Sequence, residues 1–172
     1  MSPSGRVAVV AGCRTPFAKA GTDYRDLTAL DLAKACTREL IERTEIDARG
    51  VGYVVMGQVI PSVLAPNLGR EVALRVGLPM STPAHSVNRA CASANEAIAE
   101  VATAILQGHA DVGIAGGAES LSDVPILHSK RMARILVEAS KARGLGAKLA
   151  AFASLRPADS RTANTCRSQP VR

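Results

Sequence analysis

The stretch His85-Ser-Val-Asn-Arg-Ala-Cys91-Ala-Ser-Ala-Asn-Glu96 decides the fold, because it joins a short extended run to a long amphipathic helix. A helix N-terminus points unpaired N–H groups at whatever lies there, and its macrodipole adds about half a positive charge. This setting stabilises a thiolate, the form in which cysteine acts as a nucleophile. Cys91 is therefore a candidate nucleophile. The alternative is a small buried hydrophobic residue, the usual role of a free cysteine.

The residues after Cys91 predict a helix and then a strand. Apolar side chains recur at spacings of three and four, which indicates one buried stripe; they are Ala94, Ala97, Ile98, Val101, Ala102 and Ile105. Gly108 is a stop signal before the apolar run 110–115. Ser93 and Glu96 have the spacing of a capping box, which would start the helix two residues after Cys91.

The rest of the chain up to residue 127 alternates extended and helical patterns. Strands are predicted at 6–12, 53–60, 84–87 and 110–115, and helices at 27–43, at 67–74 within the segment 66–76, and from Cys91 onward. Alternating strands and helices are typical of an α/β fold whose parallel sheet is covered on both faces. Two Phe, two Tyr and no Trp leave Ala, Val, Leu and Ile to fill the core of this 172-residue chain.

Composition argues against several classes of protein. No apolar stretch approaches the roughly 20 residues that span a bilayer, and the first residues do not resemble a signal or transit peptide. The four cysteines, Cys13, Cys36, Cys91 and Cys166, and the scattered histidines lack zinc-ligand or redox-motif spacing. We expect reduced thiols, no metal site and a cytoplasmic location.

Positive charge is concentrated at the C-terminal end. Residues 1–127 hold 11 Lys and Arg against 13 Asp and Glu, whereas residues 128–172 hold 10 against 2. Residues 130–155 predict a basic amphipathic helical hairpin, suited either to an ordinary solvated helix pair or to an anionic membrane surface or acidic partner. No aromatic or motif pattern favours nucleic acid. Residues 157–172 have no period and are expected to be disordered.

Three motifs in order resemble the thiolase family over about residues 5–156. They are Gly12-Cys-Arg-Thr-Pro-Phe17, Val87-Asn-Arg-Ala-Cys-Ala-Ser93 and Ala115-Gly-Gly-Ala-Glu-Ser-Leu-Ser122. The segment 129–143 further resembles the 3-ketoacyl-CoA thiolase (β) subunit of the fatty-acid oxidation trifunctional complex. The resemblance implies the N-terminal half of a thiolase fold, layered α/β/α with a mixed, mainly parallel sheet. Residues 1–127 would form this domain, 128–156 part of a helical loop domain associated with membrane docking, and 157–172 a tail outside the family pattern.

The resemblance also implies a chemistry. Thiolases cleave 3-ketoacyl-CoA with coenzyme A, their substrate and not a resident cofactor, to acetyl-CoA and a shortened acyl-CoA. Cys91 matches the cysteine that carries the acyl group as a thioester, and its N–H would help to hold the oxyanion. Gly116, Gly117 and Glu119 match a loop that lines the site and are interpreted as shaping residues. Arg14 is interpreted as structural, and Ala94 stands where thiolases often carry Gly.

Other parts of the family machinery match no residue of this chain. The Gly-His-Pro histidine, the Cys-x-Gly cysteine and the Asn-Glu-Ala-Phe-like segment are absent, and His85 is an alternative base only by proximity. We therefore expect a truncated, inactive fragment of an enzyme that acts as a homodimer with a hydratase/dehydrogenase α subunit. Two alternatives are a ketoacyl-synthase-like condensing enzyme and a non-catalytic remnant that binds a membrane or partner.

Overall fold

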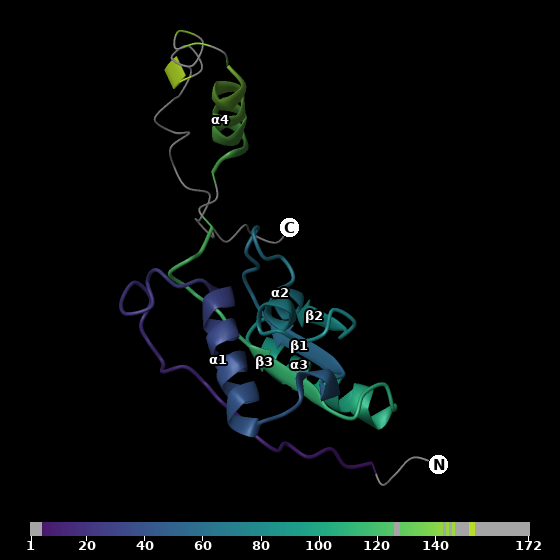
Figure 1. Cartoon of the computed structure of the whole chain (residues 1–172). Helices are drawn as coiled ribbons and strands as arrows, with labels where there is room; N and C mark the ends of the chain where they lie inside the picture. The colour runs from purple at the N-terminus through teal and green to yellow at the C-terminus, as the bar shows by residue number, and fades with distance from the viewer. Residues whose placement is uncertain (1–4, 126–127, 143, 145, 147–151, 154–172) are drawn as a thin grey trace, which may run out of the picture. The chain divides into compact units, whose positions relative to one another are not determined.

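The computed structural model describes residues 5–125, 128–142, 144, 146 and 152–153 (Figure 1). The chain divides into two compact units, Met1–Val124 and Pro125–Arg172. The assignment of residues 1–127 to a thiolase N-terminal domain, of 128–156 to part of a loop domain and of 157–172 to a tail remains a prediction. Most of the second helix of the predicted hairpin and all of the tail 157–172 lie outside the described residues. Within the described part, no helix is both long and apolar enough to cross a bilayer.

A three-stranded parallel sheet forms the centre of the first unit. Its strands are β1 (Tyr53–Gly57), β2 (Ala84–Val87) and β3 (Gly113–Gly117), in the spatial order β2-β1-β3. Val55 of the central strand is in register with His85 on one side and Ala115 on the other. The predicted strand at 84–87 has the observed bounds, whereas the other two differ from prediction by a few residues.

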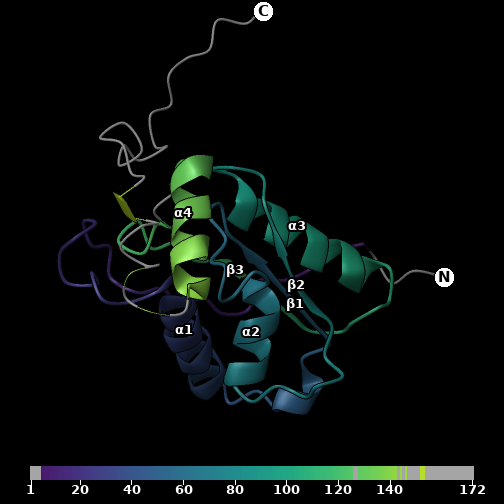
Figure 2. The same cartoon turned by 90° about the horizontal axis from the view of Figure 1, so that it is seen from above.

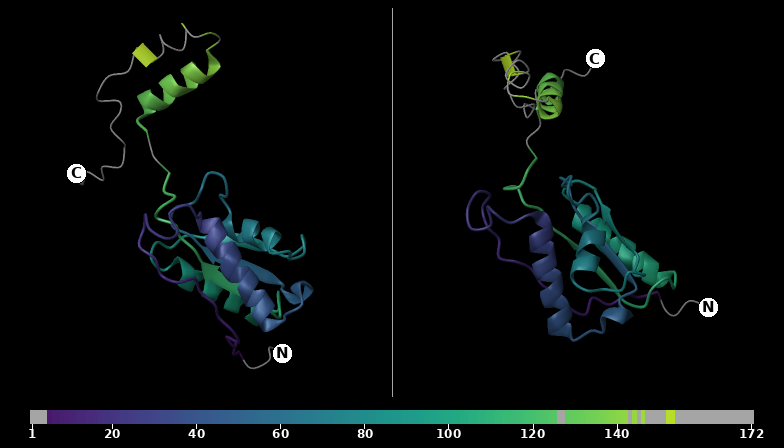
Figure 3. Two further views of the ribbon diagram at one scale, coloured as in Figure 1. Left: turned by 60° about the vertical axis from the view of Figure 1, so that its left-hand side comes forward. Right: turned by 45° about the horizontal axis from the view of Figure 1, so that its top comes forward.

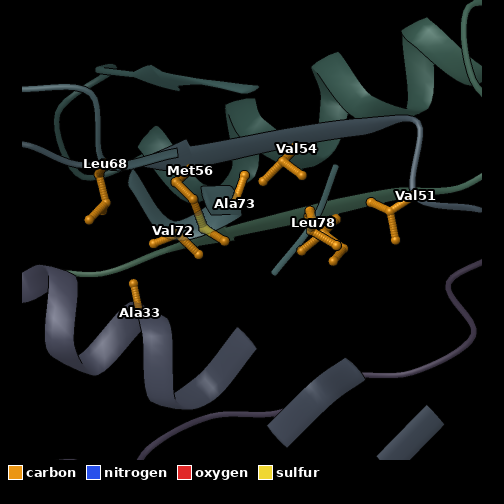
Figure 4. Close-up of a cluster of buried hydrophobic side chains, with 9 residues drawn as sticks. Ala33, Val51, Val54, Met56, Leu68, Val72, Ala73 and Leu78 are labelled. Atoms are coloured by element: carbon orange, nitrogen blue, oxygen red, sulfur yellow. The ribbon is translucent and has the colours of Figure 1, made fainter. Parts of the chain in front are cut away.

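Helices cover both faces of this sheet. The helices α1 (Ala29–Thr44) and α2 (Leu68–Arg75) lie on one face and α3 (Ser93–Leu106) on the other, while a short turn of helix, η1 (Ala48–Gly50), precedes β1 (Figures 2 and 3). Alternate side chains of β1 point to opposite faces, as the pleat of a strand requires. Val54 and Met56 therefore join the cluster with α2 (Figure 4), and Val55 packs on α3. The predicted layered α/β architecture is confirmed.

The buried stripe of α3 differs in part from the predicted one. Ala97 and Val101 are buried as expected, together with Ser93 and Ala104. Ile98 is half exposed, because α3 turns the face formed by residues 93, 97, 101 and 104 to the sheet. Ile98 lies at the edge of that face. The spacing of the apolar residues correctly indicates a helix but places its buried face about one residue off.

The strand predicted at residues 6–12 is wrong. These residues carry no strand structure, and Val9 and Val10 are 86% and 88% exposed. An extended segment becomes a strand only when its N–H and C=O groups pair with a neighbour. The described strands pair with one another in the order β2-β1-β3, and none of them pairs with residues 6–12.

Side-chain caps fix the starts of α1 and α2. The Thr28 hydroxyl accepts a hydrogen bond from the Asp31 N–H at 3.1 Å, and the Asp31 carboxylate accepts from the Thr28 N–H at 3.2 Å. This capping box satisfies two backbone donors that a helix otherwise leaves unpaired. At α2, Asn67 Oδ1 accepts from the Arg70 N–H at 3.1 Å.

Replacing Thr28 by Ala should lower the free energy of unfolding by about 1 kcal/mol at pH 7. The hydrogen bond from the Thr28 side chain, followed by that from its backbone N–H, lowers the pKa of the Asp31 carboxyl. A carboxyl whose pKa is lower in the folded state than in the unfolded state stabilises the fold at pH values above the unfolded-state pKa. This stabilisation is lost as the pH falls through the folded-state pKa. Urea unfolding at pH 7 and pH 3 should therefore show a smaller deficit in acid. Thr103→Ala, at an exposed helical position, is the matched control, and equal losses for both variants would contradict the prediction.

The second unit contains α4 (Lys130–Lys141), capped where the Ser129 hydroxyl accepts from the Met132 N–H at 3.2 Å. Ile135 and Ala139, four residues apart, are buried. Four basic residues of the helix are exposed, namely Lys130, Arg131, Arg134 and Lys141. The first helix of the predicted basic hairpin is thus present and amphipathic.

Candidate active site

Cys91 lies at the tip of a tight turn between β2 and α3. The Ala92 N–H donates to the Arg89 carbonyl at 3.0 Å, so Ala90 and Cys91 occupy the two central positions of a β-turn. The side chain of Cys91 is exposed, and α3 begins two residues later at Ser93, as predicted. Ala90 has a φ of 47°, a left-handed conformation that costs a non-glycine residue energy and is typical of constrained functional turns.

The predicted capping box of Ser93 and Glu96 is wrong, because both side chains hold the turn instead. Ala92 is the N-cap and makes no side-chain cap hydrogen bond. The buried Ser93 hydroxyl accepts from the Arg89 N–H at 2.8 Å and donates to the Ala90 carbonyl at 2.7 Å. Glu96 forms an ion pair with Arg89. The turn that presents Cys91 is therefore fixed from the first turn of its own helix.

Two glycines let α3 approach the carboxyl ends of the strands. A Cβ on Gly57, the last residue of β1, would lie 2.5 Å from the Ser93 carbonyl carbon. A Cβ on Gly117, the last residue of β3, would lie 3.0 Å from the Ala94 Cβ. Ala94 is thus accommodated against a glycine. Since sites of parallel α/β sheets form outside the carboxyl ends of the strands, Cys91 is placed where such a site is expected.

Polar side chains join the loops at this edge of the sheet. Glu119, after β3, accepts hydrogen bonds from the N–H groups of Val59 and Ile60, at 2.8 and 3.3 Å. Val59 and Ile60 thus bind a side chain instead of a neighbouring strand, and β1 ends earlier than predicted. Asn88 donates to the Val59 carbonyl at 2.9 Å and accepts from the Ala90 N–H at 3.0 Å. The sequence did not predict that Asn88 connects the loop at Val59 to the turn at Ala90, and only its place in the Cys91 motif pointed to it. Glu119 binds backbone, as expected for a shaping residue.

His85 is engaged away from the turn. Its Nε2 lies 2.7 Å from Oε2 of Glu100, and its ring packs edge-to-face on Tyr53 at 5.8 Å. Glu100 is seven residues beyond the start of α3, about 10 Å along the helix axis. No contact between His85 and Cys91 occurs, so the structure gives no support to His85 as the base.

A cavity of about 460 Å³ lies beside the loop that follows β3 in the first unit. It is lined by the segment 13–20, by α1 residues and by the loop 117–122, so it brings together two of the three motifs. Among the described residues, the contacts of Arg14 are local, namely a hydrogen bond from Nε to the Thr15 carbonyl at 3.2 Å and a cation–π contact with Phe17 at 6.0 Å. Cys91 is not among the lining residues. Over the described ranges, no group of three or more His, Cys, Asp or Glu is arranged to hold a metal ion.

The fold and this site define a class of parallel α/β domains in which a rigid turn presents a cysteine at a helix start beside glycine-lined strand ends. The N-terminal domain model of thiolases matches residues 7–156. The chain belongs to the thiolase family.

Relatives and solved structures agree with this assignment. A 3-ketoacyl-CoA thiolase of Pectobacterium carotovorum is 49% identical over 154 residues, which are 90% of this chain and 35% of the relative. One of Shewanella pealeana is 45% identical over 150 residues, or 87% and 34% of the two chains. The chain therefore spans about a third of the length of the curated relatives that it matches.

Two crystal structures share the fold. The Acat5 thiolase of Ascaris suum in complex with coenzyme A superposes with a TM-score of 0.66 at 28% identity, covering 69% of this chain and 31% of that one. The acetyl-CoA acetyltransferase of Bacillus anthracis gives 0.67 at 27% identity, covering 70% and 31%. The described residues thus form part of a thiolase fold, and the predicted resemblance is confirmed.

Proposed function

We propose that this chain supplies the nucleophile of a thiolytic acyltransferase of fatty-acid β-oxidation, with Cys91 as the residue that takes the acyl group. The observation that carries the proposal is the exposed thiol of Cys91 on a fixed turn that immediately precedes α3. The family assignment supplies the reaction, thiolysis of a 3-ketoacyl-CoA to acetyl-CoA and an acyl-CoA shortened by two carbons.

The turn offers what an acyl transfer needs at the nucleophile. The Cys91 thiolate attacks the ketone carbonyl, and cleavage of the carbon–carbon bond leaves the acyl group on sulfur as a thioester. In the described part of the chain, the Cys91 N–H has no hydrogen-bond acceptor, and neither do the N–H groups of Ala94 and Asn95 in the first turn of α3. Unpaired N–H groups beside the sulfur are suited to stabilise negative charge that develops on the acyl oxygen.

The proton transfers need further groups. His85 is bound to Glu100, and the histidine and second cysteine expected from the family match no residue here. We therefore expect no measurable thiolysis of acetoacetyl-CoA by this chain alone. Coenzyme A enters as substrate, and no resident cofactor is proposed.

The acylation step can be tested by itself. Incubation with acetyl-CoA should acetylate Cys91 at least about tenfold faster than Cys13 or Cys36, because Cys91 is exposed beside unpaired N–H groups whereas Cys13 and Cys36 are partly buried. Peptide mass spectrometry locates the acetyl group, and free coenzyme A in excess should suppress it. Cys91→Ala should abolish this modification and Cys13→Ala should retain it. Acetylation spread evenly over the cysteines would refute the proposal.

We further propose that the surrounding assembly follows the family resemblance. It would be a cytoplasmic homodimer that binds a hydratase/dehydrogenase α subunit, with residues 130–155 against an anionic membrane surface. What supports the membrane contact is α4, with exposed Lys130 and Arg134 and with Val137 half exposed on the same helix. Basic amphipathic helices of this kind bind anionic lipid surfaces.

Vesicle binding should accordingly depend on charge. The chain should co-sediment with vesicles containing phosphatidylserine at low salt and dissociate at about 1 M salt, where the Debye length is about 3 Å. Lys130→Glu with Arg134→Glu should weaken binding, whereas Lys34→Glu on α1 should not. Equal binding to neutral phosphatidylcholine vesicles would contradict an electrostatic contact.

A further inference from the structure

Two cysteines that are 23 residues apart in sequence meet in the first unit. The Cys36 thiol, on α1, donates a hydrogen bond to the Cys13 carbonyl oxygen with a sulfur–oxygen distance of 3.1 Å. Both residues are partly buried, both are free thiols, and both line the cavity of about 460 Å³. This contact joins α1 to the extended segment that precedes it.

The electrostatics of Cys36 agree with this proximity. Burial raises the pKa of the Cys36 thiol to about 11, and the neighbouring Cys13 contributes to the same shift through a hydrogen bond and charge repulsion. Two thiols that influence each other's ionisation are close in space. At neutral pH, the Cys36 thiol is consequently protonated and slow to react with an oxidant.

We propose that Cys13 and Cys36 form an oxidation-sensitive dithiol that hydroperoxides convert to a disulfide. The resemblance assigns no role to either cysteine, and the pair is separate from the Cys91 turn. Both residues line the cavity, which can admit a small oxidant beside them, and the hydrogen bond holds the Cys36 sulfur against the backbone of Cys13. Disulfide geometry requires such backbone proximity.

The reaction balances with one hydroperoxide per pair. The Cys13 thiolate attacks the peroxide oxygen, the O–O bond breaks, and hydroxide or alkoxide leaves, giving Cys13 sulfenic acid. The Cys36 sulfur then attacks the Cys13 sulfur, a sulfur–sulfur bond forms, and the sulfur–oxygen bond breaks. Water leaves with the Cys36 proton, so that hydrogen peroxide and two thiols yield one disulfide and two waters.

A disulfide at this place would tie the N-terminal segment to α1. The segment 5–26 has no regular strand or helix of its own. Cross-linking Cys13 to Cys36 would restrict it in the unfolded chain and stabilise the fold. Oxidation should therefore raise the melting temperature by several degrees, on the order of 5 °C.

Trypsin separates the four cysteines, which makes the test direct. Cleavage releases Cys13 in 7–14, Cys36 in 35–38, Cys91 in 90–130 and Cys166 in 162–167. After hydrogen peroxide treatment and alkylation, a non-reducing peptide map should show 7–14 linked to 35–38, at least about tenfold above any other pair. Dithiothreitol should reverse the link. In guanidinium chloride, the pairing should lose this preference.

Variants separate the pair from the other thiols. Cys91→Ser should leave the link intact, and Cys36→Ser should remove it while Cys13 still reacts. Since the wild-type map needs no variant, a misfolded Cys36→Ser chain would not obscure the result. Absence of the 7–14 to 35–38 link from the oxidised native chain, or its formation in the same proportion in native and denatured chains, would overturn the proposal.

Discussion

Iodoacetamide at pH 7 should alkylate Cys91 about 100-fold or more faster than Cys36 in the folded chain. Only the thiolate reacts, and burial, followed by the neighbouring Cys13, raises the pKa of Cys36 from 9.0 to about 11. Two pKa units correspond to about 100 times less thiolate at neutral pH. Cys91 is exposed on its turn, so the reagent reaches it without the steric barrier that surrounds Cys36. We also expect Cys91 to react faster than Cys13 and Cys166.

The pH dependence distinguishes this explanation from simple shielding. The labelling rate of Cys36 should rise about tenfold per pH unit up to roughly pH 11, so its disadvantage shrinks as the solution becomes basic. Rates follow from peptide mass spectrometry over pH 7–10. Unfolding in guanidinium chloride should bring the four cysteines within a few-fold of one another. Equal labelling of all four in the folded chain would remove the case for a specially placed Cys91.

Gly69→Ala should destabilise the first unit by about 3 kcal/mol or more, a large part of the stability of a typical domain. A Cβ on Gly69 would lie 2.0 Å from the His85 carbonyl oxygen, which belongs to the backbone of β2. The close approach is fixed by the Gly69 N–H, which donates to the Ser86 hydroxyl at 3.0 Å. An added methyl group must therefore push α2 off the sheet.

Gly50→Ala is the matched control for this variant. A Cβ at Gly50 meets no atom within 4 Å, so the free energy of unfolding should change by less than about 0.5 kcal/mol. Thermal and urea unfolding followed by circular dichroism measure both variants. If Gly69→Ala unfolds like the wild-type chain, the contact between α2 and β2 is not as close as described.

Local signals predicted much of the fold. The bounds of β2 and the approximate position of α2 follow from strand and helix patterns, which act within a few residues. The helix after Cys91 likewise followed from the spacing of its apolar residues. Motif order was also sufficient for the family. The Cys91 motif precedes α3 and the 115–122 motif includes the end of β3, whereas the motif 12–17 follows no strand among the described residues.

Interactions with partners outside a single helix or strand could not be predicted in this way. Residues 6–12 have strand composition, but pairing depends on a neighbour that composition does not reveal. Ser93 and Glu96 have capping-box spacing, yet the turn around Ala90 takes both side chains. The Glu119 carboxylate binds the N–H of Val59, 60 residues earlier, a contact without any local signal.

The uncovered valines of residues 6–12 also affect how the molecule behaves in a test tube. β3 lies at the border of the sheet, and an unpaired border strand is a template on which another extended chain can add. The segment around Val9 and Val10 is almost fully exposed and has β-forming residues, so it can add to such a strand in another molecule. Crowded solutions should thus favour intermolecular β-sheet growth, which makes dilute handling and early light-scattering checks part of any purification.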